Sequence, residues 1–294
     1  MRLDERINGK TKLIGLLGNP VEHTVSPQLH NTLSRMLDIN AVYIPIKVEK
    51  NGLESAVKGL KACNFTGFNV TIPFKEEIVT YVDECTPDVK LSGCANTVKN
   101  TDGRLYAYNT DADGFVRSFE EQTHTCFKGK SVVLFGAGGT ARSLAIKIAS
   151  EGAVKLYIAN RTIQRAHDIA DTVNSCIGKI AESMDTTSME RNGIIESCDI
   201  IVNTTSLGMH PNVDESPLCD SIRLDTRQIV YDVIYNPVKT KFLKQAESSG
   251  CKSLNGLGML FYQGILAYEI WMQIDIANNI IKELSEEFLK YFGK

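Results

Sequence analysis

Long apolar runs are missing from this sequence of 294 residues, and no stretch of about 18 apolar residues offers a membrane-spanning helix. An excess of charge of one sign is missing too, because 32 Lys and Arg face 35 Asp and Glu, a formal net charge of −3. A nucleic-acid-binding protein normally carries a basic excess, so no such partner is expected. The 43% of hydrophobic residues argues against disorder.

Cysteine pairs with metal or disulfide spacing are also lacking. The eight cysteines are scattered, at positions 63, 85, 94, 126, 176, 198, 219 and 251, with no C-x-x-C among them. Such scatter favours reduced thiols over a disulfide framework. There is no H-E-x-x-H pattern, and we predict no metal site. The first twelve residues are charged and lack the apolar segment of a signal peptide, so we expect a cytoplasmic protein.

What the sequence does have is alternation of strand and helix patterns, over a length that favours two domains. This alternation is typical of βαβ units and a mainly parallel sheet. Ser26 is expected to cap a helix that has Pro27 at its first position. The first half predicts strands at 12–17, 41–48 and 67–72 and a helix at 52–63. The second half predicts strands at 131–135, 154–159, 199–203 and 228–234, while 178–192 fits no pattern.

The predicted domain boundary lies in residues 113–129, where apolar residues at helical spacing indicate a connecting helix. The final stretch, 264–292, also has helical spacing and lies beyond the last strand of the second series. We expect it to return to the first domain. The fold class is therefore a two-domain α/β protein, whose first domain comprises residues 1–112 plus 255–294 and whose second comprises 113–254.

A glycine-rich turn, Gly136-x-Gly138-x-x-Ala141, lies between a predicted buried strand and a helix. The first glycine permits a tight turn, and the second allows the backbone to approach a pyrophosphate. Ala141 still allows close packing of helix on strand, and the helix N-terminus offers free N–H groups. We interpret the turn as a dinucleotide site; a tight turn in another doubly wound fold is the alternative.

The end of the next strand indicates which dinucleotide is bound. NAD-binding domains usually have an Asp or Glu there for the ribose 2′-hydroxyl. This chain has Asn160-Arg161-Thr162 instead, with Arg165 one turn later. Guanidinium groups suit a 2′-phosphate through bidentate contacts, so we predict NADP as the cofactor. The alternative is that both arginines are solvated residues at the start of a helix.

Short polar side chains gather at the ends of predicted elements in the first half. Thr24 and Ser26 place two hydroxyl groups before a helix, which suits a small anion such as a carboxylate, although a plain helix cap is the simpler interpretation. Asn69 and Thr71 share one face of a strand end, and Lys75 follows Pro73. An isolated lysine is usually a solvated surface charge. Further residues of this kind, Asn96-Thr97 and Asn109-Thr110-Asp111, suggest a polyol site.

Taken together and in order, these segments resemble the shikimate dehydrogenase family over essentially the whole chain. The resemblance rests on Gly18–Pro27, Asn69–Lys75, Ala95–Thr97, Asn109–Asp111, Gly136–Ala141, Asn160–Thr162, Asn203–Met209, Asp232–Pro237 and Asn255–Gln263. It implies an N-terminal α/β substrate-binding domain and a Rossmann NADP-binding domain, with the active site in the cleft between them and the C-terminal helices returning to the first domain.

The resemblance also implies roles for individual residues. The catalytic pair would be Lys75 and Asp111. Substrate would be bound by Thr24, Ser26, Asn69, Thr71, Lys75, Asn96, Asp111, Tyr235 and Gln263. The phosphates of NADP would be bound by Gly136, Ala137, Gly138, Gly139, Thr140, Ala141, Asn160, Arg161, Thr162 and Arg165. The nicotinamide side would be lined by Thr204, Ser206, Met209, Ile234, Gly256 and Met259.

The implied activity is the reversible reduction of 3-dehydroshikimate to shikimate by NADPH, a step toward aromatic amino acids. Lys75 as an ammonium would give a proton to the carbonyl oxygen, oriented by Asp111. The partner would be a small-molecule substrate, and the resemblance allows a homodimer.

Three alternatives remain: a dual quinate/shikimate dehydrogenase, a non-catalytic NADPH-binding sensor, and a folate-type dehydrogenase. The last would not explain the paired hydroxyls of Thr24 and Ser26, and a sensor has no need of Lys75 with Asp111. Two residues depart from the family pattern. Thr24 stands where Ser is usual, and its extra methyl group bears on the preference between shikimate and quinate as substrate. Ala112 stands where Gly is common.

Overall fold

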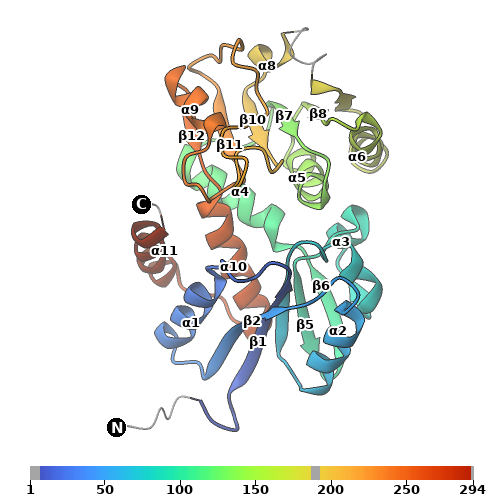
Figure 1. The fold of residues 1–294 in the computed structure, drawn as a ribbon, viewed down its shortest axis with the longest axis vertical. Helices are drawn as coiled ribbons and strands as arrows, with labels where there is room; N and C mark the ends of the chain where they lie inside the picture. The colour runs from blue at the N-terminus through green and yellow to red at the C-terminus, as the bar shows by residue number, and fades with distance from the viewer. Residues whose placement is uncertain (1–6, 187–192, 293–294) are drawn as a thin grey trace. The chain divides into compact units, whose positions relative to one another are not determined.

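The computed structural model describes residues 7–186 and 193–292 and divides the chain into two compact units (Figure 1). The N-terminal unit comprises Met1–Thr110 and Phe261–Tyr291, and the second unit comprises Asp111–Leu260 with Phe292–Lys294. The chain passes from one unit to the other within two helices, α4 (Thr110–Thr123) and α10 (Leu257–Met272). The C-terminal segment therefore belongs to the unit with which the sequence begins.

The N-terminal unit is built on a six-stranded sheet in the order β2-β1-β3-β5-β6-β4. Strand β1 pairs in parallel with β2 and β3, as expected of βαβ units. Strands β5 and β6 form an antiparallel hairpin, turning at Asp102 and Gly103, which the alternation of patterns did not predict. The elements are β1 (Lys12–Gly18), α1 (Ser26–Met36), β2 (Ala41–Lys47), α2 (Leu53–Ala62), β3 (Gly67–Val70), η1 (Glu77–Tyr81), β4 (Glu84–Cys85), α3 (Pro87–Ser92), β5 (Thr97–Thr101) and β6 (Arg104–Tyr108).

The two faces of this sheet have different characters. On one face, Phe68 and Val70 of β3 join an apolar core with the buried side chains of α2. Because side chains alternate along a strand, Gly67 and Asn69 point to the opposite face. There Gly67 lies against Trp271 of α10, and Asn69 contacts Tyr43 of β2. The second face therefore carries the polar and aromatic groups of this unit.

Two helix ends differ from the prediction. Val25, not Ser26, is the N-cap of α1, and Ser26 is the first helical residue, with no side-chain cap bond. The reason is local: the Thr24 hydroxyl accepts the Ser26 N–H at 3.3 Å, so the capping group comes from two residues earlier. At the C-terminus the helical stretch is interrupted after Met272, where Gln273 has φ +57°, and resumes as α11 (Asn278–Phe292).

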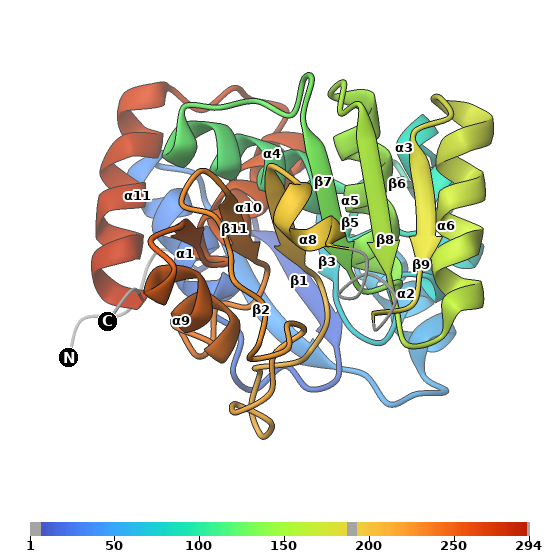
Figure 2. The ribbon, with the colours of Figure 1, turned by 90° about the horizontal axis from the view of Figure 1, so that it is seen from above.

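The second unit contains an all-parallel six-stranded sheet in the order β12-β11-β10-β7-β8-β9. Figure 2 shows β7, β8 and β9 side by side, as this order requires. Strand β9 falls in the stretch that fitted no pattern, of which residues 187–192 lie outside the described part. The elements are α4, β7 (Ser131–Phe135), α5 (Gly139–Ser150), β8 (Lys155–Ala159), α6 (Ile163–Cys176), β9 (Ala181–Met184), α8 (Ile194–Ser197), β10 (Ile200–Asn203), β11 (Ile229–Asp232), α9 (Lys241–Ser248) and β12 (Lys252–Leu254).

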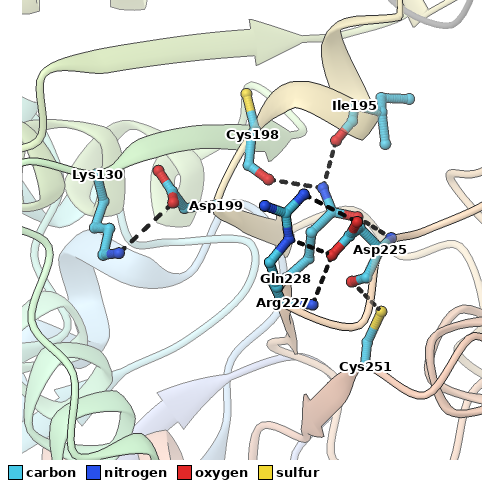
Figure 3. Close-up of polar contacts among 8 residues, drawn as sticks. All are labelled: Lys130, Ile195, Cys198, Asp199, Asp225, Arg227, Gln228 and Cys251. Carbon is cyan, nitrogen blue, oxygen red and sulfur yellow. Dashed lines mark hydrogen bonds and ion pairs between the residues drawn. The ribbon is translucent and has the colours of Figure 1, made fainter.

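A buried glutamine joins α8 to the turn before β11 (Figure 3). The Gln228 amide donates to the carbonyl oxygens of Ile195 and Cys198, each at 2.7 Å. These carbonyls lie at the end of α8, where the Ile195 oxygen also accepts the Cys198 N–H at 3.4 Å. The Gln228 oxygen accepts the Asp225 N–H at 2.8 Å, so one side chain satisfies backbone groups of two segments.

All eight cysteines are thiols in the structure. Within residues 7–186 and 193–292, no helix has both the length and the apolar character to cross a bilayer.

The packing of Gly67 generates the first prediction. A Cβ at this position would lie 2.5 Å from the Val98 carbonyl oxygen and in steric conflict with the Trp271 indole. The indole also donates to the same carbonyl, at 2.9 Å, so it has little room to move. We expect Gly67→Ala to lower the free energy of unfolding by about 1–3 kcal/mol, as overpacking does, measured by denaturant titration.

Gly59→Ala is the matched control. Gly59 lies within α2, is exposed, and has no described atom within 4 Å of its would-be Cβ. Alanine favours a helix over glycine by about 0.5–1 kcal/mol, so this variant should be at least as stable as the wild type. Equal effects of the two substitutions would contradict the role given to the Gly67 contact.

Candidate active site

A buried hydrogen-bond network connects three elements of the N-terminal unit. Asn69 of β3 donates from Nδ2 to the Asn96 carbonyl oxygen and to the Thr97 hydroxyl, both at 3.0 Å. The Thr97 hydroxyl donates in turn to Asn96 Oδ1 at 3.0 Å. Asn96 Nδ2 donates to Gln263 Oε1 of α10 at 3.3 Å. Three residues predicted for the substrate site, Asn69, Asn96 and Gln263, are therefore joined in one network.

The start of α4 completes this network. The Thr110 N–H donates to Asn96 Oδ1 at 2.8 Å, and Asn96 Nδ2 donates to the Thr110 hydroxyl at 3.0 Å. Asn96 and Thr97 are 2% and 0% exposed, so these amide and hydroxyl groups have no bulk water to pair with. Buried polar groups are costly unless they are paired, and this pairing gives the site one arrangement without a ligand. The sequence analysis named Thr97 and Thr110 only as members of polar segments that suggest a polyol site, without individual roles.

Tyr43 of β2 extends the network toward α1. Its hydroxyl donates to Asn69 Oδ1 at 2.8 Å. Burial raises the pKa of Tyr43, with the Ser26 hydroxyl as a smaller opposing influence, so the phenol is neutral. The His30 ring stacks on the phenol with centroids 4.3 Å apart, and Asn31 binds the backbone N–H and carbonyl of Tyr43. The sequence shows Tyr43 only as one more residue of a β-strand pattern, so it was missed.

The two predicted anion-binding hydroxyls lie together at the start of α1. The Thr24 hydroxyl donates to the Ser26 hydroxyl at 3.2 Å. Ser26 is 8% exposed and Thr24 is half-buried. Lys75 is half-buried, and its carbonyl oxygen accepts the N–H of Ala95 at 2.8 Å. Ala95 directly precedes Asn96, so this bond places the Lys75 backbone beside the network. Thr71 follows β3, and its N–H donates to the Leu17 carbonyl at 2.9 Å.

Two predicted substrate residues belong to the second unit. Asp111 is buried and directly follows Thr110, while Tyr235 is half-buried and follows β11.

The glycine-rich turn of the second unit has space for a ligand. Gly136 has φ +112°, and a Cβ there would lie against Thr204, so both the turn and its packing need glycine. Gly138 differs: it is the exposed N-cap of α5, and no described atom lies within 4 Å of its would-be Cβ. Internal packing therefore does not require glycine there, whereas close approach of a pyrophosphate to the helix N-terminus does. Ala137, Gly139 and Thr140 are partly exposed in the same turn, and Ala141 is buried.

The predicted 2′-phosphate residues follow β8 directly. Arg161, Thr162 and Arg165 are exposed, and Asn160 Nδ2 donates to the Thr162 carbonyl at 2.9 Å. Two guanidinium groups are thus available to solvent at the carboxyl end of a strand next to the glycine-rich turn. The residues present fit NADP, because a phosphate and not a hydroxyl is matched by two cations.

A buried carboxylate shapes the loops that carry the predicted nicotinamide residues. Asp232 is 0% exposed and accepts from Asn203 Nδ2 at 3.0 Å, the Ile234 N–H at 3.1 Å and the Thr240 hydroxyl at 2.6 Å. Burial raises the pKa of Asp232 to about 6, although all three hydrogen bonds lower it. Asn203 and Asp232 begin two of the segments that carry the family resemblance, but the sequence prediction gave no individual role to them or to Thr240.

Several residues assigned to the nicotinamide side come directly after Asn203 and Asp232 in the sequence. The Thr204 hydroxyl donates to the Phe135 carbonyl at 2.6 Å, which ties the end of β10 to the glycine-rich turn. The Gly256 N–H donates to the Ile234 carbonyl at 3.0 Å. Ser206 and Met209 are exposed, whereas Ile234 and Met259 are buried. In the described part of the chain, no three His, Cys, Asp or Glu side chains group as metal ligands.

Comparison with known proteins agrees with this geometry. Residues 16–98 match the family model described as the shikimate dehydrogenase substrate binding domain, and residues 118–233 match that of shikimate / quinate 5-dehydrogenase. The chain is 41% identical over 280 residues to the shikimate dehydrogenase (NADP⁺) of Alkaliphilus oremlandii, covering 94% of this chain and 97% of the relative. The chain belongs to the shikimate dehydrogenase family.

Solved structures of the shikimate dehydrogenase family agree in fold over nearly the full length. A shikimate dehydrogenase in complex with NADP⁺ is 37% identical, with a TM-score of 0.87 and 98% coverage of both chains. The shikimate 5-dehydrogenase of Listeria monocytogenes, in complex with shikimate and NAD, is 36% identical, with a TM-score of 0.88 and coverage of 96% and 99%. The two-domain α/β fold class predicted from the sequence is thereby confirmed.

Asp232 generates the second prediction. Its folded-state pKa of about 6 exceeds the ordinary value of 3.8, so its contribution to stability is complete at low pH and is lost as the pH rises to 6. We expect wild type to lose about 2 kcal/mol relative to Asp232→Asn between pH 4 and pH 7. The measurement is denaturant unfolding of both proteins at the two pH values. Parallel behaviour of the two proteins would contradict the assignment.

Proposed function

We propose that this chain catalyses the reversible, NADP-dependent interconversion of 3-dehydroshikimate and shikimate in the shikimate pathway. The observation that carries the proposal is the buried Asn69–Asn96–Gln263 network, which occurs in a chain of the shikimate dehydrogenase family. Paired amides and hydroxyls held in one arrangement suit a polyhydroxylated ring. The paired hydroxyls of Thr24 and Ser26 suit the carboxylate of such a substrate.

We assign the two ligands to different parts of the chain. The substrate domain is residues 1–112 plus 255–294, and the NADP domain is residues 113–254. Within the first, Thr24 and Ser26 bind the carboxylate, while Asn69, Thr71, Asn96 and Gln263 bind ring hydroxyls or support that network. In the second, the turn from Gly136 to Ala141 binds the pyrophosphate, and Asn160, Arg161, Thr162 and Arg165 bind the 2′-phosphate end. The open space at Gly138 supports the assignment of the pyrophosphate, and the exposure of both arginines supports that of the 2′-phosphate.

The roles in the reaction follow from the chemistry of the side chains. Reduction of the ketone needs a hydride at carbon and a proton at oxygen; NADPH, when bound, supplies the hydride. Lys75 as an ammonium holds the proton for the carbonyl oxygen and polarises it. Asp111 orients Lys75 and accepts from the substrate hydroxyl. Tyr235 joins the substrate site, and Thr204, Ser206, Met209, Ile234, Gly256 and Met259 line the nicotinamide side.

The second candidate function is a dehydrogenase of dual quinate and shikimate specificity. Thr24 favours considering it, because this residue keeps the hydroxyl of the usual Ser but adds a methyl group near the carboxylate-bearing carbon. Quinate has an added hydroxyl at that carbon. We also propose a cytoplasmic location, which eight cysteines in the thiol state support.

The experiment that tests the proposed function follows NADPH absorbance with shikimate or quinate crossed against NADP or NAD. We expect rapid turnover with shikimate and NADP alone. Comparable turnover of quinate would move the assignment to the dual-specificity relatives and point to Thr24. Binding of NADP without turnover of either substrate would favour a non-catalytic sensor and would overturn the proposal.

A third prediction concerns Lys75. Lys75→Ala should lower kcat by about 10²–10⁴-fold, the usual worth of a positioned proton donor, while the affinity for shikimate changes much less. Steady-state kinetics gives kcat, and calorimetric titration with shikimate gives the affinity.

Lys58→Ala provides the control, since Lys58 is an exposed residue of α2 paired with Glu54. It should behave as wild type. A large loss of shikimate affinity in Lys75→Ala with a near-normal kcat would show that Lys75 binds substrate and does not donate the proton.

A further inference from the structure

The orientation of the Asn69 carboxamide is determined by a backbone group. Asn69 Nδ2 lies 3.0 Å from the Asn96 carbonyl oxygen, and a carbonyl oxygen only accepts hydrogen bonds. The nitrogen must therefore face Asn96, and Oδ1 must face the Tyr43 hydroxyl, 2.8 Å away. It follows that the Tyr43 hydroxyl is the donor in this bond.

The opposite end of the network is determined in the same way. The Thr110 backbone N–H, which only donates, lies 2.8 Å from Asn96 Oδ1. Asn96 Nδ2 therefore faces Gln263, and the Gln263 atom that receives it at 3.3 Å must be the oxygen. Two backbone groups thus fix the orientations of the Asn69, Asn96 and Gln263 carboxamides.

These directions determine what Asn69 can offer to a ligand. Its two amide hydrogens are both used, one on the Asn96 carbonyl and one on the Thr97 hydroxyl. Its oxygen has two lone pairs, and one of them accepts from the Tyr43 hydroxyl. Asn69 is therefore suited to accept a hydrogen bond from a hydroxyl group and not to donate one.

We propose that Tyr43 is a positioning residue for the substrate site, because its hydroxyl holds the Asn69 carboxamide with the oxygen available to a ring hydroxyl of the substrate. This inference rests on the proposed function and deepens it, by stating which hydrogen-bonding character the site requires at that ring position. A substrate with a hydroxyl there is accepted, and one with only an acceptor is not.

The surroundings of Tyr43 suit this role. The phenol is 2% exposed, His30 stacks on one face, and Asn31 binds its backbone at 2.8 and 3.0 Å. The phenol is also neutral and so keeps its proton for Asn69, and burial lowers the pKa of His30 to about 3, so the stacked ring carries no charge. The stacking on His30 and the two Asn31 bonds therefore help to keep the hydroxyl next to Asn69.

The test is Tyr43→Phe, which removes the hydroxyl and leaves the ring on His30. Without its donor, the Asn69 carboxamide loses the bond that holds its oxygen in place. We expect the KM for shikimate to rise about 5–20-fold, while kcat and the KM for NADP change less than about 2-fold. Stabilisation of the protein by shikimate in thermal unfolding should fall in proportion to the lost affinity, which gives a readout independent of turnover.

Tyr268→Phe is the matched control. The Tyr268 hydroxyl is also buried, and it pairs with Ser34 Oγ at 2.9 Å in the same unit. Its removal should lower the melting temperature to a similar extent and leave the KM for shikimate within about 2-fold of wild type.

The outcomes separate the inference from the function on which it rests. Wild-type protein that does not turn over or bind shikimate would remove the proposed function. Active wild type, with Tyr43→Phe and Tyr268→Phe showing the same KM, would overturn the inference alone and leave Tyr43 a purely structural residue.

Should Tyr43→Phe not fold, wild-type protein provides a second measurement. Analogues of shikimate in which fluorine replaces one ring hydroxyl at a time can accept but cannot donate at that position. At least one of them should bind about tenfold more weakly than shikimate. Equal binding of all three would overturn the inference.

Discussion

A carboxamide removed from water needs partners for both its oxygen and its nitrogen. The partners of Asn96 join three segments of the N-terminal unit that are distant in the sequence. Its side chain binds Thr97 beside it, Thr110 at the start of α4 and Gln263 on α10. These residues come from a hairpin, a connecting helix and the C-terminal segment. Leaving any of these groups without its partner would cost more than the bond itself contributes, so the three segments are required together.

The sheet of the N-terminal unit separates stability from chemistry by its two faces. The face covered by α2 is apolar and contains Phe68 and Val70. The other face carries the aromatic rings of His30, Tyr43 and Trp271 against the amide network. Because alternate residues of β3 point to opposite faces, a single strand supplies both the core and the site. A one-residue shift of that strand would exchange the two.

The second unit meets the same physical constraint with a charge. Asp232 is buried with three donors around it, and burial outweighs those hydrogen bonds in setting its pKa. The loop after β10 and the loop after β11 are held to each other through this carboxylate. The glycine-rich turn is anchored to the first of these loops through Thr204, whose hydroxyl binds the Phe135 carbonyl. Burying the Asp232 carboxylate thus costs stability, while its hydrogen bonds fix the loops that carry the predicted nicotinamide residues.

Local features of the chain were readable from the sequence because their causes are local. The strand before Gly136, the turn itself and the helix after it follow from a continuous apolar run, two glycines and helical spacing. The missing carboxylate after β8 and the presence of Arg161 and Arg165 are likewise visible in the sequence. The hairpin of β5 and β6 was not predicted, although Asp102 and Gly103 at its turn are typical hairpin residues, because strand–helix alternation dominated the interpretation.

The sequence by itself determined the two-domain α/β class, the nucleotide-type turn and the residue types of the polar cluster. Only the tertiary structure decided how those residues are paired. Tyr43 and Asn69 are 26 residues apart, and Asn96 and Gln263 are 167 apart, so no local pattern connects them. The direction of each bond depends on backbone groups that face Asn69 and Asn96 only after the strands have paired. The periodicity of the sequence indicates on which face of a strand or helix a side chain lies. Its hydrogen-bond partner on that face depends on how distant segments pack.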